Sequence, residues 1–301
     1  MQLLAADIGY GSVKSYTNKN LSKFPSAVSL VKRAIFESSE ATYSFNGLNY
    51  NLGNEATRDA YATRDYTFLE KFAPLLMYKV ITDANLDLTK PITLATGLSL
   101  LNWDKKEEFA NSLQDFTVNN NRVNNIELLL LPQGKGIYLD CLKNRPELDE
   151  QLVMVVDIGY NTLDIIPFEK GKPLASEAWS NTHGVNIMTN ELDKYLVSKF
   201  SLSLNETQVN DAFQKQYVTC GTRKDLSIII DEEKQRYVEQ VFQLLRSKNN
   251  QLYNSADTII IAGGGAYSFM DFEFTDKNVI FPKGEYEYSN VRGYYESIKN
   301  G

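Results

Sequence analysis

Histidine, cysteine and tryptophan are scarce in this sequence: there is one histidine, and there are two cysteines and two tryptophans among 301 residues. A single histidine argues against Ser-His-Asp hydrolase chemistry and against a histidine-rich metal site. That residue, His183, stands directly before Gly184 and a helical pattern, and we interpret it as a turn residue. Cys141 and Cys220 lie far apart and predict neither a disulfide framework nor a Cys-x-x-Cys site.

Positive charge and long apolar runs are also lacking. The chain has 31 Lys and Arg against 38 Asp and Glu, a formal net charge of −7 at pH 7. Sequence-independent DNA binding needs basic surface, so this composition argues against it. No apolar stretch predicts a membrane span, and the first residues lack the basic segment and apolar stretch of a signal peptide. We therefore expect a cytoplasmic protein without membrane contacts, which the few cysteines also favour.

One eight-residue pattern occurs twice, with the second copy 150 residues after the first. Residues 7–14 are Asp-Ile-Gly-Tyr-Gly-Ser-Val-Lys, and residues 157–164 are Asp-Ile-Gly-Tyr-Asn-Thr-Leu-Asp. Each copy follows a short apolar run, which predicts a strand, an Asp at its end, a glycine-containing turn and a second strand. A repeat at about half the chain length indicates two similar halves.

The two turns have the chemistry of a phosphate site. Gly9, Gly11 and Gly159 tolerate positive φ and let backbone amides approach a ligand closely, and converging amides bind anions. Ser12 and Thr162 add hydroxyl donors.

A carboxylate precedes each turn. Asp7 and Asp157 suit Mg²⁺ that is held largely through water. For one copy alone, an ordinary Asp-x-Gly turn is the alternative. Two copies in register, with a third motif, favour phosphate binding.

The third motif is a β-branched strand, residues 258–262, that leads into Gly263-Gly264-Gly265-Ala266. Three glycines at a helix start offer bare amides and a positive dipole end. A dinucleotide fingerprint is rejected because Ser268 occupies its last glycine position and no second βαβ unit is evident. Tight helix–strand packing remains the alternative reading of the glycines. A Walker A loop is absent from the sequence.

Strands and helical patterns alternate through both halves, which predicts α/β layers. Residues 24–31 are a strand candidate, and residues 232–252 predict a long helix. Asn102 is expected to cap a helix over 103–113, and Asn205 to cap a shorter one. Residues 32–66 are polar and irregular and are interpreted as a small inserted subdomain. The charged, Pro146-containing stretch 144–150 is the best domain boundary.

In order and spacing, these motifs resemble those of the actin-like ATPase superfamily, and within it the plasmid-segregation and archaeal actin-like group (ParM/StbA type). Residues 7–14 match the first phosphate motif, 157–164 the second and 259–266 the adenosine motif. Residues 96–100 are similar to the segment before the interdomain connection. Residues 131–134 match the first connecting helix, and 290–294 resemble the second.

The resemblance implies a two-domain α/β fold, ribonuclease H-like and duplicated, with a nucleotide cleft between the domains. Domain I would cover residues 1–150, with the insertion at about 32–66, and a C-terminal helix at about 284–301 would pack back on it. Domain II would cover residues 151–283, with an inserted helical subdomain at about 185–256.

By the same resemblance, ATP or ADP and Mg²⁺ would bind between the domains. The residues that would surround the phosphates from domain I are Asp7, Gly9, Gly11, Ser12, Val13 and Lys14. Those from domain II are Asp157, Gly159, Asn161 and Thr162. The residues that would touch adenosine are Gly263, Gly264, Gly265 and Ala266. Asp7 and Asp157 would hold hydrated Mg²⁺.

Two residues would be catalytic by this resemblance, Gln133 and Asp157. Gln133 falls where the superfamily places the residue that orients the attacking water, and an amide can position water by donating and accepting hydrogen bonds. This chain has Pro-Gln-Gly at 132–134, whereas the segregation ATPases more often have a Pro-Glu-Ser-like segment. An unimportant residue at a helix start is the alternative for Gln133. Lys14 shares a strand face with Ser12, so a phosphate contact is expected.

The expected function is a nucleotide-dependent, filament-forming ATPase. Its task would be plasmid or DNA segregation, and an acidic chain would reach DNA indirectly, through a DNA-binding adaptor protein. Two alternatives remain open: a small-molecule kinase of the same superfamily, and a non-polymerising nucleotide-binding scaffold.

Overall fold

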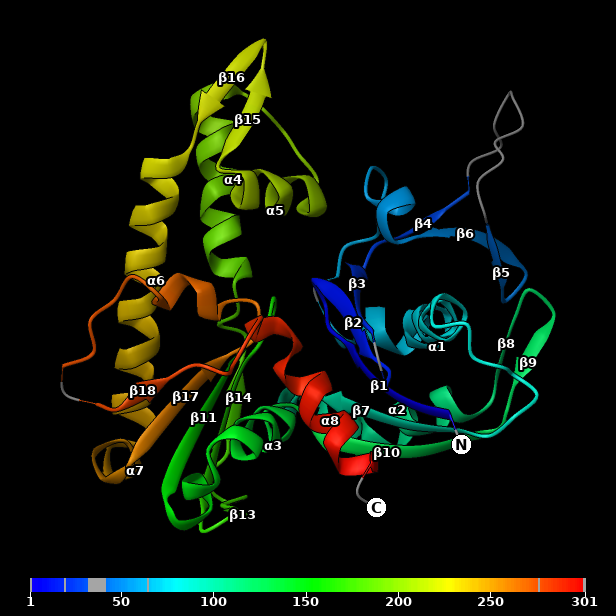
Figure 1. Cartoon of the computed structure of the whole chain (residues 1–301). Coiled ribbons are helices and arrows are strands. Elements are labelled where there is room, and N and C mark those ends of the chain that lie inside the picture. Colours follow the sequence, from blue (N-terminus) through cyan, green and yellow to red (C-terminus); the bar gives the residue numbers. More distant parts are fainter. Residues whose placement is uncertain (1, 19, 32–41, 64, 276, 300–301) are drawn as a thin grey trace. The chain divides into compact units, whose positions relative to one another are not determined.

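The computed structural model describes residues 2–18, 20–31, 42–63, 65–275 and 277–299. They form two compact units. Unit 1 comprises Met1–Leu139 and Asn290–Gly301, and unit 2 comprises Asp140–Ser289 (Figure 1). The division therefore lies at 139/140 and 289/290, whereas the sequence placed the boundaries at 150/151 and 283/284.

Unit 1 is built on a five-stranded sheet in the order β10-β7-β1-β2-β3. Its strands are β1 (Gln2–Ile8), β2 (Ser12–Tyr16), β3 (Leu21–Pro25), β7 (Ile92–Leu98) and β10 (Ile126–Pro132). β1 pairs parallel with β7 and antiparallel with β2, so the hairpin predicted over the first motif is confirmed. The buried faces of β1 and β7, with Leu4 and Leu94 fully enclosed, make these strands the centre of the core.

The main helices of unit 1 are α1 (Tyr66–Asp83), α2 (Lys106–Gln114) and α8 (Ser289–Lys299). A further helix, α3 (Lys135–Asn144), begins in unit 1 and ends in unit 2. A 3₁₀ helix, η2 (Leu100–Lys105), precedes α2. The expected cap at Asn102 is wrong, because Ser99 caps η2 by accepting a hydrogen bond from the Leu101 amide. The Asn102 side chain instead donates to the Tyr10 hydroxyl at 3.1 Å and so supports the first motif.

Two smaller sheets complete unit 1. One has the order β4-β6-β5, with β4 (Val28–Leu30), β5 (Tyr43–Phe45) and β6 (Leu48–Leu52), and is followed by the 3₁₀ helix η1 (Gly53–Ala56). The other pairs β8 (Phe116–Val118) with β9 (Asn121–Val123). The strand expected over 24–31 is split into β3 and β4, which belong to different sheets. Part of the insertion expected at 32–66, namely 32–41 and 64, lies outside the described residues.

Helix α8 packs against α3 with almost no space between the two backbones. A Cβ atom at Gly293 would overlap the Gly136 carbonyl oxygen, and one at Gly97 would overlap the Tyr294 hydroxyl. Tyr294 is fully buried, and the Asn290 side chain accepts a hydrogen bond from the Gly134 amide at 3.0 Å. Helix α8 therefore supplies part of the unit 1 core.

Unit 2 repeats the arrangement of unit 1. Its sheet has the order β13-β12-β11-β17-β18, with β14 paired to β12. The strands are β11 (Leu152–Ile158), β12 (Leu163–Glu169), β13 (Lys172–Pro173), β14 (Trp179–Asn181), β17 (Thr258–Ala262) and β18 (Val279–Ile280). β11 pairs antiparallel with β12 and parallel with β17, just as β1 pairs with β2 and β7. The duplication predicted from the repeat is confirmed.

The helices of unit 2 are α4 (Asn186–Phe200), α5 (Glu206–Lys215), α6 (Ser227–Lys248) and α7 (Asn250–Ser255). The short 3₁₀ helices are η3 (Pro146–Glu150), η4 (Ala266–Phe269) and η5 (Tyr286–Tyr288). Asn205 caps α5 in a capping box with Gln208, as predicted. The helix expected over 232–252 begins earlier and is divided at Asn249. A hairpin of β15 (Tyr217–Cys220) and β16 (Thr222–Asp225) was not predicted.

Helices α4 and α6 lie side by side in unit 2 (Figure 1). Their apolar side chains pack together and onto the unit 2 sheet. Leu192 and Val241 belong to one buried cluster with Ile165 and Ile261 of the strands. The second motif begins at the end of β11, and the glycines of the third motif follow β17 directly. Within the described residues, none of the helices combines the length and apolarity that crossing a membrane requires.

Candidate functional site

The first turn, between β1 and β2, is closed by hydrogen bonds from a residue that the sequence did not single out. The Ser26 hydroxyl donates to the Gly9 carbonyl oxygen, and the Ser26 amide donates to that of Gly11 at 3.3 Å. These bonds bend the chain between β3 and β4, which explains why residues 24–31 are not one strand. Because both carbonyls are bound by Ser26, the turn has a fixed shape before any ligand arrives.

Asp7 is only 4% exposed, and two other predicted site residues, Gln133 and Lys14, contact its carboxylate. The Gln133 side-chain amide donates to one Asp7 carboxylate oxygen at 2.8 Å. The Lys14 ammonium lies 3.5 Å from the other oxygen, from the register position opposite Asp7. A buried carboxylate needs such partners, because charge without compensation is strongly disfavoured in the interior. Unit 1 therefore brings Asp7, Lys14 and Gln133 together, although Gln133 is distant in sequence.

The second turn, between β11 and β12, is supported by the start of α4. The amides of Val185 and Asn186 donate to the carbonyl oxygens of Gly159 at 3.0 Å and Tyr160 at 2.8 Å. A Cβ atom at Gly184 would overlap the Tyr160 carbonyl oxygen, so only glycine permits this approach. Gly184 therefore lets the start of α4 contact the second turn. In the sequence, the feature that could have revealed this role was its position between His183 and a helical pattern.

The glycines Gly9 and Gly159 of the two turns also have a packing role. Neither Gly9 nor Gly159 has positive φ, so neither turn uses that freedom of glycine. A Cβ atom at Gly9 would lie 3.1 Å from the Ser12 carbonyl oxygen, and one at Gly159 would lie 3.3 Å from that of Thr162. These positions are glycine because the hairpin folds tightly back on itself. Beside them, Asn161 and Thr162 are buried.

The third motif lies against the second. Gly263 has φ +85°, and a Cβ atom there would lie 2.6 Å from an Asp157 carboxylate oxygen. The Gly265 amide donates to the Ile158 carbonyl oxygen at 3.0 Å. Unit 2 therefore brings the Asp157 carboxylate together with the glycine loop, residues 263–265.

No long helix begins at these glycines. The loop leads into η4, a 3₁₀ helix of four residues, Ala266–Phe269. The dipole of an α-helix is the sum of many aligned peptides, and four residues supply few of them. The expected contribution from a helix end is therefore wrong here, and any anion contact would depend on the loop amides themselves.

Gly264 is the one glycine of the loop that the protein's own structure does not require. Its φ lies outside the left-handed region, and no atom lies within 4 Å of where its Cβ would be. Its neighbours differ, since Gly263 has positive φ and a Cβ at Gly265 would overlap the Ile158 side chain. A ligand that approaches the backbone closely would explain a glycine at this position.

The described residues contain no cluster of three or more His, Cys, Asp or Glu side chains that could hold a metal ion. Such a cluster is not what Mg²⁺ needs in a nucleotide site, where it is bound through one or two carboxylates together with phosphate and water. Asp7 and Asp157, each at the end of a strand before a turn, have the chemistry for that role.

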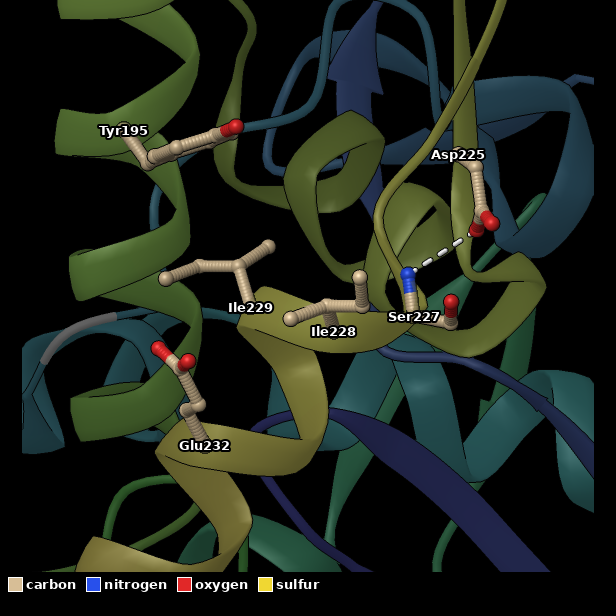
Figure 2. Close-up of a pocket in the computed structure, with 6 residues that line it drawn as sticks. All are labelled: Tyr195, Asp225, Ser227, Ile228, Ile229 and Glu232. Atoms are coloured by element: carbon tan, nitrogen blue, oxygen red, sulfur yellow. Dashed lines mark hydrogen bonds between the residues drawn. The ribbon is translucent and has the colours of Figure 1, made fainter.

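A separate hollow of about 330 Å³ lies in unit 2 (Figure 2). Its lining residues come from α4, β16 and the start of α6: Tyr195, Asp225, Ser227, Ile228, Ile229 and Glu232. The Asp225 carboxylate accepts a hydrogen bond from the Ser227 amide at 3.0 Å. None of the predicted site residues lines this hollow, so it is not the site of the three motifs.

Two family models match the sequence. The model of the N-terminal domain of actin like proteins matches residues 5–136. The model of the C-terminal part of the archaeal actin homologue MreB-like matches residues 155–272. No curated protein matches the chain in sequence.

Solved structures match the whole chain. The archaeal actin homolog Ta0583 is 17% identical with a TM-score of 0.82, over 100% of both chains, and so is the same protein in complex with ADP. A subunit of a 15-stranded ParM filament from Clostridium botulinum is 20% identical with a TM-score of 0.75, over 100% of this chain and 99% of that one. At a sequence identity of 17–20%, the likeness establishes the fold alone. The predicted two-domain, actin-like α/β fold is confirmed.

Proposed function

The chain belongs to the actin-like superfamily, since a model of actin like proteins matches residues 5–136 and a model of the archaeal actin homologue MreB-like matches residues 155–272, and we propose that it is an ATPase that assembles into filaments under nucleotide control. The predicted family resemblance is confirmed by those matches. The observation that carries the proposal is the repeated hairpin. In the strand register, Asp7 stands opposite Lys14 in unit 1, and Asp157 stands opposite Asp164 in unit 2. Two buried carboxylates at matching positions, each before a turn, fit a duplicated phosphate-binding fold.

ATP or ADP is the proposed ligand, and an archaeal actin homolog of the same fold was crystallised with ADP. The open space at Gly264 is consistent with a ligand that touches the loop backbone. In this proposal the phosphates contact the amides of the two turns and the hydroxyls of Ser12 and Thr162. Asp7 and Asp157 bind Mg²⁺ through its water, and the ion neutralises phosphate charge.

We propose that Gln133 positions the attacking water and that Asp7 orients Gln133. The Gln133 side-chain nitrogen donates to the Asp7 carboxylate at 2.8 Å, and this bond fixes the direction of the Gln133 amide group. The amide oxygen is then the group that accepts a hydrogen bond from water. An amide is too weak a base to take the proton, so its contribution is position, which is much of what phosphoryl transfer requires of a protein.

The kinase alternative has less support. A kinase needs a carboxylate that reaches the substrate hydroxyl, and Asp164 of the second motif is a possible base by residue type. Asp164 is 1% exposed and stands opposite Asp157 within the β11–β12 hairpin. A side chain so enclosed is poorly placed to take a proton from a substrate.

The biological role that we propose is segregation of plasmid or other DNA through an adaptor protein. A net charge of −7 supports indirect contact, since direct binding to phosphate backbones relies on basic residues. A relative of the same fold forms a 15-stranded filament, which supports self-assembly as the means. The cytoplasmic location remains a prediction.

Light scattering and sedimentation of the purified chain, over a wide range of protein concentration, test the proposal. Assembly is expected with ATP and Mg²⁺, and phosphate release should accompany it without any added metabolite. The matched controls are ADP with Mg²⁺, and ATP with a chelator. Hydrolysis or binding without assembly would favour the scaffold, and phosphate transfer only to an added small molecule would favour the kinase. Negative-stain images would show whether the pelleted material is filamentous.

A further inference from the structure

Strand β10 is one edge of the unit 1 sheet, whose order is β10-β7-β1-β2-β3 (Figure 1). It spans seven residues, Ile126–Pro132, and four of them are consecutive leucines. An edge strand carries a row of backbone N–H and C=O groups that its own sheet does not pair, and these groups can pair with another chain. Proteins commonly prevent such pairing by keeping edge strands short, or by placing lysine or proline on them.

The other edges of the two main sheets are protected in this way. Strand β3, at the opposite edge of the unit 1 sheet, carries the exposed Lys23 and ends at Pro25. In unit 2, β13 consists only of Lys172–Pro173, β18 has two residues and β14 has three. Strand β10 is the exception, because it is long and its one charged residue is Glu127.

The backbone groups of β10 point alternately toward β7 and away from it. The odd-numbered residues face β7, since the Ile92 amide donates to the Asn125 carbonyl oxygen at 2.9 Å and the parallel pairing continues along the whole strand. Ile126, Leu128 and Leu130 therefore direct their amides and carbonyls outward. Among the residues that the structure describes, nothing forms a hydrogen bond with these three amides.

The side chains along this edge are apolar and partly open to solvent. Leu129 is 36% exposed, and Leu128 and Leu130 are half-buried. The Glu127 carboxylate accepts a hydrogen bond from the Thr93 hydroxyl of β7 at 3.2 Å, so the strand's one charge is bound to its neighbour in the sheet. The middle of the edge therefore offers free main-chain groups between leucine side chains.

We propose that β10 is the contact of a symmetric dimer, in which the β10 strands of two copies of the chain pair antiparallel across a two-fold axis at Leu128. In this register, the outward amides of Ile126, Leu128 and Leu130 all meet outward carbonyls of the other copy. Leu128 stands opposite Leu128, and Ile126 stands opposite Leu130. Glu127 stands opposite Leu129, so the carboxylates of the two copies do not oppose each other.

The strand itself favours a second copy as its partner. A two-fold contact requires a surface that is complementary to itself, and an uncharged row of leucines with free amides and carbonyls meets that requirement. The β3 edge of another copy fits poorly, because Pro25 lacks a donor and Lys23 would bring a charge against leucine. A two-fold contact closes at two copies and this one needs no nucleotide, so the inference does not depend on the proposed function.

Analytical ultracentrifugation of the full chain without nucleotide, over a wide range of concentration, tests the inference. The wild type should pass from monomer to dimer as the concentration rises. Leu129→Lys adds a charge to the edge, and Leu128→Pro removes an outward amide while the bonds to β7 remain. Each should raise the Kd of the dimer by about 10-fold or more. The matched control is Leu21→Lys, since Leu21 is 39% exposed on β3, and it should dimerise as the wild type does.

Oxidative cross-linking tests the register. Leu128→Cys places two thiols directly opposite each other, within the reach of a disulfide. Leu129→Cys places its thiol opposite Glu127, and the two thiols lie diagonally and farther apart. A covalent dimer should therefore form mainly with Leu128→Cys. The wild type, which has Cys141 and Cys220 as free cysteines, gives the background.

A wild-type chain that stays monomeric at every concentration would overturn the inference. Dimers that persist unchanged in both Leu129→Lys and Leu128→Pro would also overturn it, as would loss of the dimer in Leu21→Lys, which would move the contact to β3. Equal cross-linking of Leu128→Cys and Leu129→Cys would reject the proposed register. Thermal unfolding shows whether each variant is folded. A chain that dimerises but binds no ATP would overturn the proposed function alone.

Discussion

Gly264 and Gly265 are neighbours in the same loop, yet their missing side chains have different reasons. A Cβ atom at Gly265 would overlap the Ile158 side chain, whereas one at Gly264 meets nothing within 4 Å. A residue whose side chain would point into open space is usually free to vary, and a change there alters stability by about 0.5 kcal/mol or less. Packing therefore explains glycine at 265, whereas glycine at 264 is explained by the proposed nucleotide, if it binds against this backbone.

We predict that Gly264→Val leaves the free energy of unfolding nearly unchanged and weakens ATP binding, because the added side chain occupies the space the ligand needs. Gly265→Ala should lower the free energy of unfolding by about 1–3 kcal/mol through overpacking. Urea unfolding and calorimetric ATP titration of both variants measure the difference. Wild-type ATP affinity in Gly264→Val would show that nothing binds against this backbone.

Gln133 is the residue through which the proposed chemistry can be separated from binding. We predict that Gln133→Ala slows phosphate release on the order of 10²-fold, the scale of a well-placed catalytic contact, and changes the Kd for ATP little. Gln133→Glu should impair binding as well, because a second carboxylate would stand against Asp7, where the amide now donates at 2.8 Å. Single-turnover phosphate release and ATP titration measure the two effects. An unchanged rate in Gln133→Ala would mean that another group positions the water.

At the scale of elements, the contact between α3 and α8 is decided by glycine. Alanine at Gly293 would gain about 1 kcal/mol of helix propensity, but its Cβ would overlap the backbone oxygen of Gly136. A backbone oxygen within a helix cannot move aside as a flexible side chain can. The clash should therefore exceed the gain in propensity, and the helices would have to separate.

We predict that Gly293→Ala lowers the free energy of unfolding by about 1–3 kcal/mol. A matched control on the same helix is Ser297→Ala, which removes only a hydroxyl that bonds to the carbonyl oxygens of Gly293 and Tyr294 within α8. That change should be neutral or slightly stabilising. The midpoints of chemical unfolding of the two variants give the comparison. Equal midpoints would indicate that α8 can move away from α3 without loss of stability.

The main strands and hairpins were predictable because their signals are local. Apolar runs ending at Asp7 and Asp157 were enough to predict both motif hairpins, and the pairing of β1 with β2 and of β11 with β12 agrees. A further signal was present and not used: Asn46-Gly47 joins β5 to β6 with φ of 49° and 76°. Asn-Gly with two positive φ values is the strongest short hairpin pattern. Residues 42–52 were therefore predictable as a hairpin.

The details of the site were not predictable from local pattern. Ser26 closes the first turn and Gln133 reaches Asp7 only because the sheet brings distant segments together. The resemblance to a family supplied the residues, but their mutual contacts required the structure.

At the scale of the whole molecule, the repeat and the alternation of strands with helices were sufficient for the fold class. The domain limits were harder to place. The charged stretch 144–150 looks like a linker, yet the chain passes from unit 1 to unit 2 within α3, a continuous helix. Residues 146–150 form η3 inside unit 2. Composition marks exposed polar segments, and it does not reveal a crossing made by an ordered helix.

The position of α8 has a consequence for how the chain matures on the ribosome. Val291 and Tyr294 are fully buried in unit 1, but they are synthesised after all of unit 2. Unit 2 is continuous in sequence and can fold as it emerges, as domains generally do during translation. Unit 1 cannot complete its core until α8 has been synthesised, and part of its apolar surface stays exposed until then. A nascent chain stalled before residue 289 would therefore expose the Gly97 and Gly136 surface that α8 covers in the finished protein.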